Sequence, residues 1–589
     1  MEEEEKIELK PANESIWYAL ATIAGEPKPL DWKITKKNRY YWNGFMRTLL
    51  SDDELNTLTD NDGNKISLDA LTDDDKAIIR KALDRDIFKK LDTLDKRNPV
   101  HYFNVEWPEH IDFEGFVFAG DALFGGAMFL GTASFRQAIF IKDVDFSEVK
   151  FMGSADFSEA AFKENASFRQ AIFIDSAEFG SAKFSEVESK GRADFFEAEF
   201  KDSTYFCRTK FNGSANFHKA TFTGDINSLI GHVDFSKAIF TEYADFSETK
   251  FTDFANFSNT IFEKNADFSN TTFKKNADFS RARFAEHEEN STGKVDFRNV
   301  TFTADANFKA VTFTQNVFFK DVLFAGIADF SDAKFKQNAD FKSATCKTTT
   351  DFTRTKFSNH PPQFFDAEVS EDTRWPQEEN FLTPTHNGET TIEHINAYER
   401  LALMMSKLEK HHDRHMFFRL EMRVRRRLDV IKDVRPAIER KHPFLKKVMN
   451  IPFFAKPIEI IVKAPVIAMN WLYEKFCDYG YGFGRALGWW FGHIVLGTVF
   501  LFPYKMTMLA TPTLANICTG IKLWGVAFAT SFSNAHSFLG LHRGALKDVY
   551  AQSAAQVPFF NLIWGFQGLF GIMFLFFLIL TVRNRFKMG

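Results

Sequence analysis

Cysteine, net charge and catalytic motifs are what this chain of 589 residues has least of. Its four cysteines, Cys207, Cys346, Cys477 and Cys518, lie far apart, without the spacing of a metal site or a disulfide framework. The formal net charge is −5, which is mild for this length. The chain has no phosphate-binding glycine loop, zinc motif or nucleophile elbow. The sequence therefore predicts no enzyme, no cofactor and no metal site.

Phenylalanine, by contrast, is abundant and regularly spaced. From Phe113 to Phe357 it returns at alternating intervals of five and six residues, in a unit that reads Ala-Asp-Phe-Ser-x-Ala-x-Phe-x-x-x. Because residues two apart share a face of extended chain, Ala and Phe are predicted to point inward and Asp, Ser, Lys and Glu outward. Such units bury their apolar side only against their neighbours. The spacing predicts a solenoid of short β-type sides joined by tight corners.

One copy of this unit is Ala155-Asp156-Phe157-Ser158-Glu159-Ala160-Ala161-Phe162, and two more copies begin at Ala266 and Ala277. The pattern resembles the Phe-centred class of pentapeptide-repeat proteins. The resemblance implies a right-handed quadrilateral β-helix over residues 106–358, about ten coils and near 50 Å long at the strand-pairing rise. Some members of the family imitate DNA with an acidic surface, which the mild charge here does not favour. The predicted interior includes Phe157, Phe162, Phe246, Phe251, Phe268, Phe273, Phe330 and Phe335.

The repeat is interrupted after Phe184, Phe222 and Phe284 and then resumes in phase. These breaks are predicted to be insertions at corners, since loop-forming residues fill them. An odd number of units separates successive breaks. With two units per coil, successive insertions should leave the solenoid at opposite corners. Cys346 occupies a Phe position and is predicted to be an inward, inert packing thiol.

Residues 1–105 are predicted to form an α-rich module. Its start, Met-Glu-Glu-Glu-Glu-Lys, has no apolar run, so we expect no secretion signal. A helix is predicted from Asp73 to Leu94, because three successive Asp residues favour its first turn. The aromatic-rich stretch 13–46 resembles part of a module found on some bacterial repeat proteins. Two interpretations stay open: a cap on the first coil, or a sensing or docking surface.

Pro361-Pro362 and Trp375-Pro376 predict a linker over 359–390, followed by a helical connector over 391–450. The connector resembles that of membrane-bound pentapeptide-repeat proteins, with two antiparallel helices turning near 411–413. His411, His412 and His415 are predicted to be a solvated turn rather than a metal site. The basic runs 423–427 and 441–447 favour the cytoplasmic side of a membrane and anionic lipid over nucleic acid.

Residues 451–589 are predicted to be a membrane domain. Spans are expected at about 486–504 and 562–582, with interfacial helices over 451–476. Basic and aromatic flanks place both termini in the cytosol, in a multi-pass protein of the inner membrane. The predicted membrane anchors are Arg485, Trp489, Trp490, Arg583, Arg585 and Lys587.

The stretch 521–538 lies between the two predicted spans. It is either a re-entrant segment or an amphipathic helix on the membrane surface. The layout resembles two-span pore-loop channels, although the potassium-filter signature is absent. The pore-lining candidates are Thr530, Ser531, Ser533, Asn534 and Ser537.

Two functions therefore stand at this stage. One is a homo-oligomeric ion channel gated by a ligand or a cytosolic protein that binds the solenoid. The other is a membrane-anchored scaffold that binds a cytosolic protein and conducts nothing. The sequence identifies neither the partner nor an ion.

Overall fold

The computed structural model falls into two units, Met1–Glu389 and Thr390–Gly589, which are treated separately below. The structure describes residues 10–11, 20–24, 32–48, 50, 52–57, 68–82, 100–101, 105–107, 110–185, 191–224, 232–284, 293–381, 392–431, 472, 474–476, 483–506, 527–529, 531–532 and 560–586.

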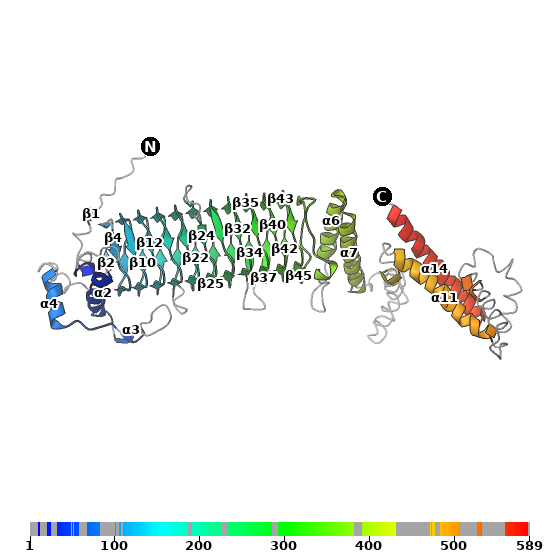
Figure 1. The fold of residues 1–589 in the computed structure, drawn as a ribbon, viewed down its shortest axis with the longest axis horizontal. Helices are drawn as coiled ribbons and strands as arrows, with labels where there is room; N and C mark the ends of the chain where they lie inside the picture. The colour runs from blue at the N-terminus through cyan, green and yellow to red at the C-terminus, as the bar shows by residue number, and fades with distance from the viewer. Residues whose placement is uncertain are drawn as a thin grey trace, which may run out of the picture. The chain divides into compact units, whose positions relative to one another are not determined.

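The repeat segment folds as a rod with four sides, each side a parallel sheet (Figure 1). A strand pairs with the strand of the same side one coil later, as β10 (Val144–Asp145) pairs with β14 (Ala166–Ser167). One coil uses two eleven-residue units, so the four sides follow one another around the rod. We number them side 1 to side 4 in chain order, which sets side 1 opposite side 3 and side 2 opposite side 4.

Side 1 consists of β2 (Val100–His101), β6 (Ala122–Leu123), β10, β14, β18 (Ala193–Asp194), β22 (Ala215–Asn216), β26 (Ala244–Asp245), β30 (Ala266–Asp267), β34 (Lys294–Asp296), β38 (Asn316–Phe318) and β42 (Ala339–Asp340). Side 2 consists of β1 (Lys10–Pro11), β3 (Val105–Trp107), β7 (Met128–Phe129), β11 (Lys150–Phe151), β15 (Ile172–Phe173), β19 (Glu199–Phe200), β23 (Thr221–Phe222), β27 (Lys250–Phe251), β31 (Thr272–Phe273), β35 (Thr301–Phe302), β39 (Leu323–Phe324) and β43 (Thr345–Cys346).

Side 3 consists of β4 (His110–Asp112), β8 (Thr132–Ser134), β12 (Ala155–Asp156), β16 (Ala177–Glu178), β20 (Thr204–Tyr205), β24 (His232–Asp234), β28 (Phe254–Asn256), β32 (Ala277–Asp278), β36 (Ala306–Asn307), β40 (Ala328–Asp329) and β44 (Thr350–Asp351). Side 4 consists of β5 (Val117–Phe118), β9 (Ile139–Phe140), β13 (Ala161–Phe162), β17 (Lys183–Phe184), β21 (Lys210–Phe211), β25 (Ile239–Phe240), β29 (Ile261–Phe262), β33 (Arg283–Phe284), β37 (Thr312–Phe313), β41 (Lys334–Phe335) and β45 (Lys356–Phe357).

Stacked phenylalanine rings fill the interior of the rod. Phe157 lies parallel to Phe179 of the next coil, with ring centroids 5.0 Å apart, and edge-on to Phe168 at 5.4 Å. The eight interior residues named from the sequence are each at most 1% exposed. Cys346 is buried in its Phe position, as predicted, and burial raises the pKa of its thiol to about 11.

The corners after sides 1 and 3 explain why Asp recurs in the unit. The Asp carboxylate accepts the backbone N–H of the residue two positions on, as Asp156 does from Ser158 at 2.8 Å. The residue after that has a left-handed backbone, with a φ of 59° at Glu159, and Ala160 N–H then bonds back to Phe157 C=O. The recurring Asp is therefore a corner cap, a use for which short carboxylates are favoured.

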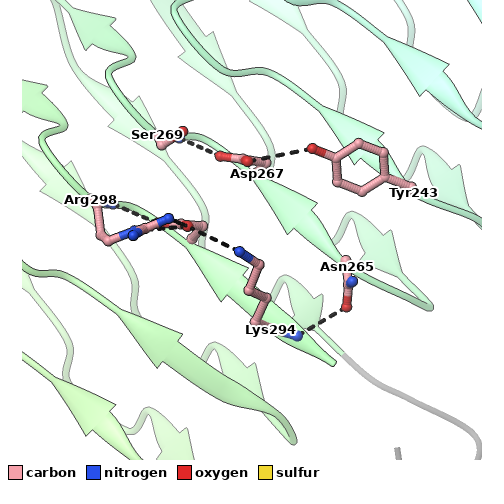
Figure 2. A network of polar contacts seen from close by, with 7 residues as sticks. Tyr243, Asn265, Asp267, Ser269, Lys294 and Arg298 are labelled. Carbon is pink, nitrogen blue, oxygen red and sulfur yellow. Dashed lines mark hydrogen bonds and ion pairs between the residues drawn. The ribbon is translucent and has the colours of Figure 1, made fainter. Parts of the chain in front are cut away.

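The insertions leave the rod after β17, β23 and β33, which belong to sides 4, 2 and 4. This confirms that successive insertions emerge at opposite corners. Asparagine side chains hold the chain where it returns after β17 and β33. Asn165 Oδ1 accepts the N–H of Arg192 at 2.9 Å, and Asn265 Oδ1 accepts that of Lys294 at 2.9 Å (Figure 2). Each asparagine sits one coil earlier than the residue it binds, so the bond fixes the register in which the repeat resumes.

The first coil is closed by α2 (Trp32–Arg47), the longest of three N-terminal helices described, with α3 (Asp52–Thr57) and α4 (Asp73–Ala82). Trp42 is fully buried against Phe113, Phe116 and Phe118, and its Nε1 donates to Val117 C=O at 2.8 Å. This contact supports the cap interpretation of the module. The predicted helix from Asp73 is described only to Ala82; its remainder to Leu94 lies outside the described residues.

The far end of the rod extends beyond the sequence boundary at 358. Phe364, Trp375 and Phe381 stack on Phe341, Phe352 and Phe357 of the preceding coil. Single β-bridges join this extra coil to the rod, such as Asp351 with Arg374. Residues 359–381 are thus a last coil rather than linker, ending in the 3₁₀ helix η2 (Glu378–Asn380). We missed it because its aromatic residues lie 23 or 24 positions after their partners instead of 22.

The second unit contains α6 (Ile392–Lys407), α7 (His411–Ile431), α11 (Phe483–Met506) and α14 (Phe560–Phe586). Helices α6 and α7 form the predicted hairpin, with the turn at residues 408–410, just before the predicted position. The apolar stripe of α6 is buried, including Ala397, Leu401 and Met405.

The left-handed corners generate a prediction. At Lys237, with a φ of 59°, Val should lower the free energy of local opening by about 1 kcal/mol, because β-branched side chains are poorly tolerated there, whereas Asn should not. Hydrogen exchange of the Ala238 amide, which bonds to Phe235 C=O, measures the change in the full chain. Lys250→Val, on a β-strand, is the matched control; an equal loss in the control would contradict the prediction.

Candidate functional site

The apolar helices α11 and α14 lie side by side in opposite directions. Near one end of the pair, Ala486 of α11 packs with Phe574 and Phe577 of α14. Near the other, Gly497 of α11 faces Gln567 of α14. Phe476, from the short described segment 474–476, closes the first end edge-on to both Trp489 and Phe574 with centroids 4.9 Å apart.

A buried polar contact joins this helix pair to the segment 527–532. Ser531 Oγ donates to the C=O of Ile494 at 2.6 Å, and Gln567 Nε2 donates to Ser531 Oγ. The Thr498 hydroxyl also donates to Ile494 C=O, at 2.9 Å. Ser531 and Thr498 are fully buried and Gln567 is 7% exposed. Ser531 therefore links α11 and α14 by donating to one helix and accepting from the other.

Close backbone approach makes this contact possible. A Cβ on Gly497 would overlap Gln567 Nε2 and come within 2.5 Å of Ser531 Oγ. Gly488 and Gly492, on the same helix, have nothing within 4 Å of such a Cβ. Gly497 is thus the point where the helix backbone admits polar side chains from its neighbours, an arrangement typical of helix contacts in membranes.

The outer surface of the helix pair is apolar. The large exposed side chains are Leu487, Trp489, Phe491, Leu496 and Val499 on α11, and Phe566, Leu569, Phe570, Ile572, Phe576 and Ile579 on α14. Polar side chains lie inside instead, namely Thr498, Ser531, Gln567 and Thr581. A water-soluble helix pair has the opposite distribution.

The structure brings one predicted pore-lining residue, Ser531, to the polar contact. Thr530, Ser533, Asn534 and Ser537 lie outside the described residues. Among the predicted anchors, Arg485, Trp489 and Arg583 are exposed and Trp490 is half-buried. Arg585 lies in the last turn of α14, and Lys587 lies outside the described residues.

Sequence reasoning missed Gln567, Gly497 and Thr498. The available signal was one amide in the otherwise apolar run 562–582 and a glycine in the middle of a predicted span. Neither signal says which residue it contacts, because the partners are 34 or more positions apart in the chain.

The α6–α7 hairpin carries the histidines of the connector. Arg425 donates to Glu421 on its own helix at 2.6 Å and to Glu399 of α6 at 3.4 Å, which ties the two helices together. Burial lowers the pKa of His415 to about 4, helped by Arg414 and Arg419 nearby, and burial raises the pKa of Asp413. Among the described residues no group of three His, Cys, Asp or Glu side chains is arranged to hold a metal ion.

The exterior of the rod carries local polar networks rather than a pocket-like site. On side 1, Asp267 accepts from Ser269 N–H at 2.8 Å and from the Tyr243 hydroxyl at 3.4 Å (Figure 2). Burial, followed by the charge of Asp245, raises the pKa of Tyr243. One coil further, Arg298 binds Asp296 through two of its nitrogens (Figure 2). The charges of Asp296 and Arg298 thus neutralise each other, and the Asp267 carboxylate is satisfied by hydrogen bonds within the rod.

Comparisons with known proteins identify the repeat. The family model of pentapeptide repeats (9 copies) matches residues 146–188, 235–283 and 292–334, all within the rod. The rod is therefore a pentapeptide-repeat β-helix, as predicted. No curated protein and no solved structure matches the chain.

One described helix, α14, is long and apolar enough to cross a membrane, over Phe566–Arg583. The two-span domain and the pore-loop resemblance stay predictions.

The contact at Gly497 predicts a steric effect. Gly497→Val should lower the stability of the α11–α14 contact by about 1–3 kcal/mol, since the added methyl groups displace Gln567 and Ser531. Gly492→Val, with the same change in helix propensity but open space around it, should have little effect. Amide protection of α14 in mild detergent measures both variants, and equal protection in the two would contradict the prediction.

His415 predicts a pH dependence of the hairpin. Its folded pKa lies below the unfolded value, so the unfolded state binds the extra proton and stability falls as pH drops from about 6.5 toward 4. We expect a loss of about 1 kcal/mol between pH 7 and 5, after discounting for partial exposure. Amide protection of α7 should show it and His415→Gln should remove it. Asp413 and Glu421, whose pKa values are raised by burial, oppose the loss, because a carboxyl with a raised pKa in the folded state adds stability as the pH falls.

Proposed function

We propose that the chain is a membrane-anchored binding protein, in which α11 and α14 form an antiparallel hairpin across the bilayer and the β-helix rod binds a cytosolic protein. The observation that carries the proposal is the inverted polarity of the helix pair, with large apolar side chains outside and Thr498, Ser531 and Gln567 inside.

Helix length supports this arrangement. Helices of 24 and 27 residues span about 36 and 40 Å, which exceeds the roughly 30 Å hydrocarbon core. Hydrogen bonding supports it too, because polar groups at membrane depth need internal partners and Ser531 and Gln567 have them. Arg485 before α11 and Arg583 near the end of α14 favour cytosolic placement of both outer ends of the hairpin.

A second candidate is the oligomeric channel predicted from the sequence. The observation in its favour is that the segment containing Ser531 enters the helix pair instead of remaining on its surface. The Ser531 hydroxyl is engaged between two helices of its own chain, however, so it offers no free donor to a path through one subunit. A pore would require several copies around an axis.

Extraction tests the anchor. Alkaline carbonate should leave the full chain in the membrane fraction, whereas a variant with Leu569→Arg, Ile572→Arg and Phe576→Arg should be released, because three charges at membrane depth cost several kcal/mol in total. A control with Thr221→Arg, Thr272→Arg and Thr301→Arg adds the same charge to the rod and should stay in the membrane. Release of the unaltered chain would refute the proposal.

Conductance separates the two candidates. Purified full chain in planar lipid bilayers should pass no ions if it is an anchor. Reproducible channel openings that disappear with Gly497→Val but persist with Gly492→Val would favour the channel instead.

A further inference from the structure

The four sides of the rod do not carry the same charges. The eleven-residue unit does not reveal this difference. Two successive units make one coil, so equivalent positions in alternate units lie on opposite sides of the rod. The outward strand residues of side 3 include Asp156, Asp278 and Asp329, and those of side 1 include Asp145 and Asp245, with no Lys or Arg at the equivalent position on either side.

Side 4 carries charges of the opposite sign. Its outward strand residues include five basic ones and no acidic one across the eleven strands: Lys183, Lys210, Arg283, Lys334 and Lys356. On the opposite side, side 2, the strands from β7 onward have only Lys150 and Lys250 as basic residues at this position, together with Glu199. Because coils rise by about 4.8 Å, the basic row on side 4 extends over roughly 34 Å.

The corner between sides 3 and 4 widens this row. Arg208, Lys237 and Arg281 occupy three of its left-handed positions and are exposed, whereas Glu159 and Asp332 occupy two others. We call these three basic residues and the five of side 4 the basic row.

Four members of the basic row lack the internal neutralisation seen on side 1. There, Arg169 binds Asp194 at 3.0 Å and Arg298 binds Asp296. Among the described residues, no carboxylate forms an ion pair with Lys210, Arg283, Lys334 or Lys356, and all four are exposed. The acidic side chains near the row are already taken, since Arg136 binds Glu159 and Arg354 binds Asp332.

We propose that the basic row docks the rod onto the anionic headgroups of the membrane that anchors the chain, an inference that rests on the proposed function. The side of a β-helix is flat and straight, so cations along it can reach a planar surface together. The anchor keeps anionic lipid at high local concentration around the rod. Docking would leave the acidic sides 1 and 3 and the opposite side 2 available to a cytosolic partner.

Lysine labelling in one molecule tests the docking. The full chain in nanodiscs of phosphatidylcholine and phosphatidylglycerol, at about 7:3, is acetylated at about 20 mM and about 500 mM NaCl. Lys210, Lys334 and Lys356 report side 4, and Lys150 and Lys250 report side 2. At low salt the labelling rate of side 4 relative to side 2 should fall by roughly threefold or more, and high salt should restore it because screening shortens electrostatic reach.

Two controls make the result specific. Discs of phosphatidylcholine alone should give no protection. For the variants, protection of Lys356 is the ratio of its labelling rate in phosphatidylcholine discs to its rate in anionic discs. The variant Lys210→Glu/Arg283→Glu/Lys334→Glu should lose this protection, whereas Lys150→Glu/Lys219→Glu/Lys250→Glu, with the same change in charge, should retain it. An unchanged ratio in anionic discs, or equal protection of both sides, would overturn the docking, as would protection that appears only with added RNA or with an acidic protein.

The same experiment shows separately whether the membrane anchor fails. If the chain does not elute with the discs at high salt, the proposed function fails. The docking is then read from sedimentation of the chain with preformed anionic vesicles at low salt. Sedimentation that both triple variants retain equally would overturn the docking as well.

Discussion

Ring stacking between successive coils is the constraint on which the rod depends. Each buried Phe lies flat against the Phe one coil away, at centroid distances near 5 Å, as Phe222 does on Phe251 at 4.9 Å. That distance matches the spacing of paired strands, so the side-chain columns and the backbone ladders have the same repeat. A coil can therefore neither stretch nor slip without breaking both. The three insertions all lie at corners, and at two of them an asparagine one coil earlier binds the returning chain and restores the register.

The cost of this regularity appears at the corners. A left-handed residue recurs once in every eleven, and most of these residues are Glu, Gln, Lys, Arg or Ser rather than Gly or Asn. Each such residue is strained by about 1 kcal/mol or more. The rod accepts the strain because the adjoining Phe and Ala are buried and the Asp cap satisfies the turn. Local backbone preference is thus overruled by packing, which is why the Phe spacing was a better guide to this fold than turn propensity.

The spacing of Phe predicted a solenoid of short β-type sides, the phase of the insertions and the place of Cys346, and the resemblance to pentapeptide-repeat proteins implied its four sides. It did not predict the last coil, where Phe364, Trp375 and Phe381 keep the stacking although the spacing has lengthened. The candidate site was harder to predict from the sequence. Ser531 could be picked out as a polar residue between apolar stretches, but its bonds to Ile494 and Gln567 depend on how three distant segments pack. A local sequence pattern does not encode that pairing. Gly497 acts by having no side chain, and the sequence alone does not distinguish it from the other glycines of α11.

Stacking fixes only the interior, so the exterior of each coil is free to vary. The regular exterior features that remain need a cause of their own. Asp on sides 1 and 3 has one, because its carboxylate caps the corner. Among the described residues, Lys210, Arg283, Lys334 and Lys356 of side 4 make no such bond, and side 2, built from the same kind of strand, carries Thr at the equivalent positions in β23, β31, β35 and β43. A structural requirement of the unit would have acted on both sides alike. The asymmetry therefore points to what the rod meets outside itself, which is the premise of the proposed docking onto anionic lipid.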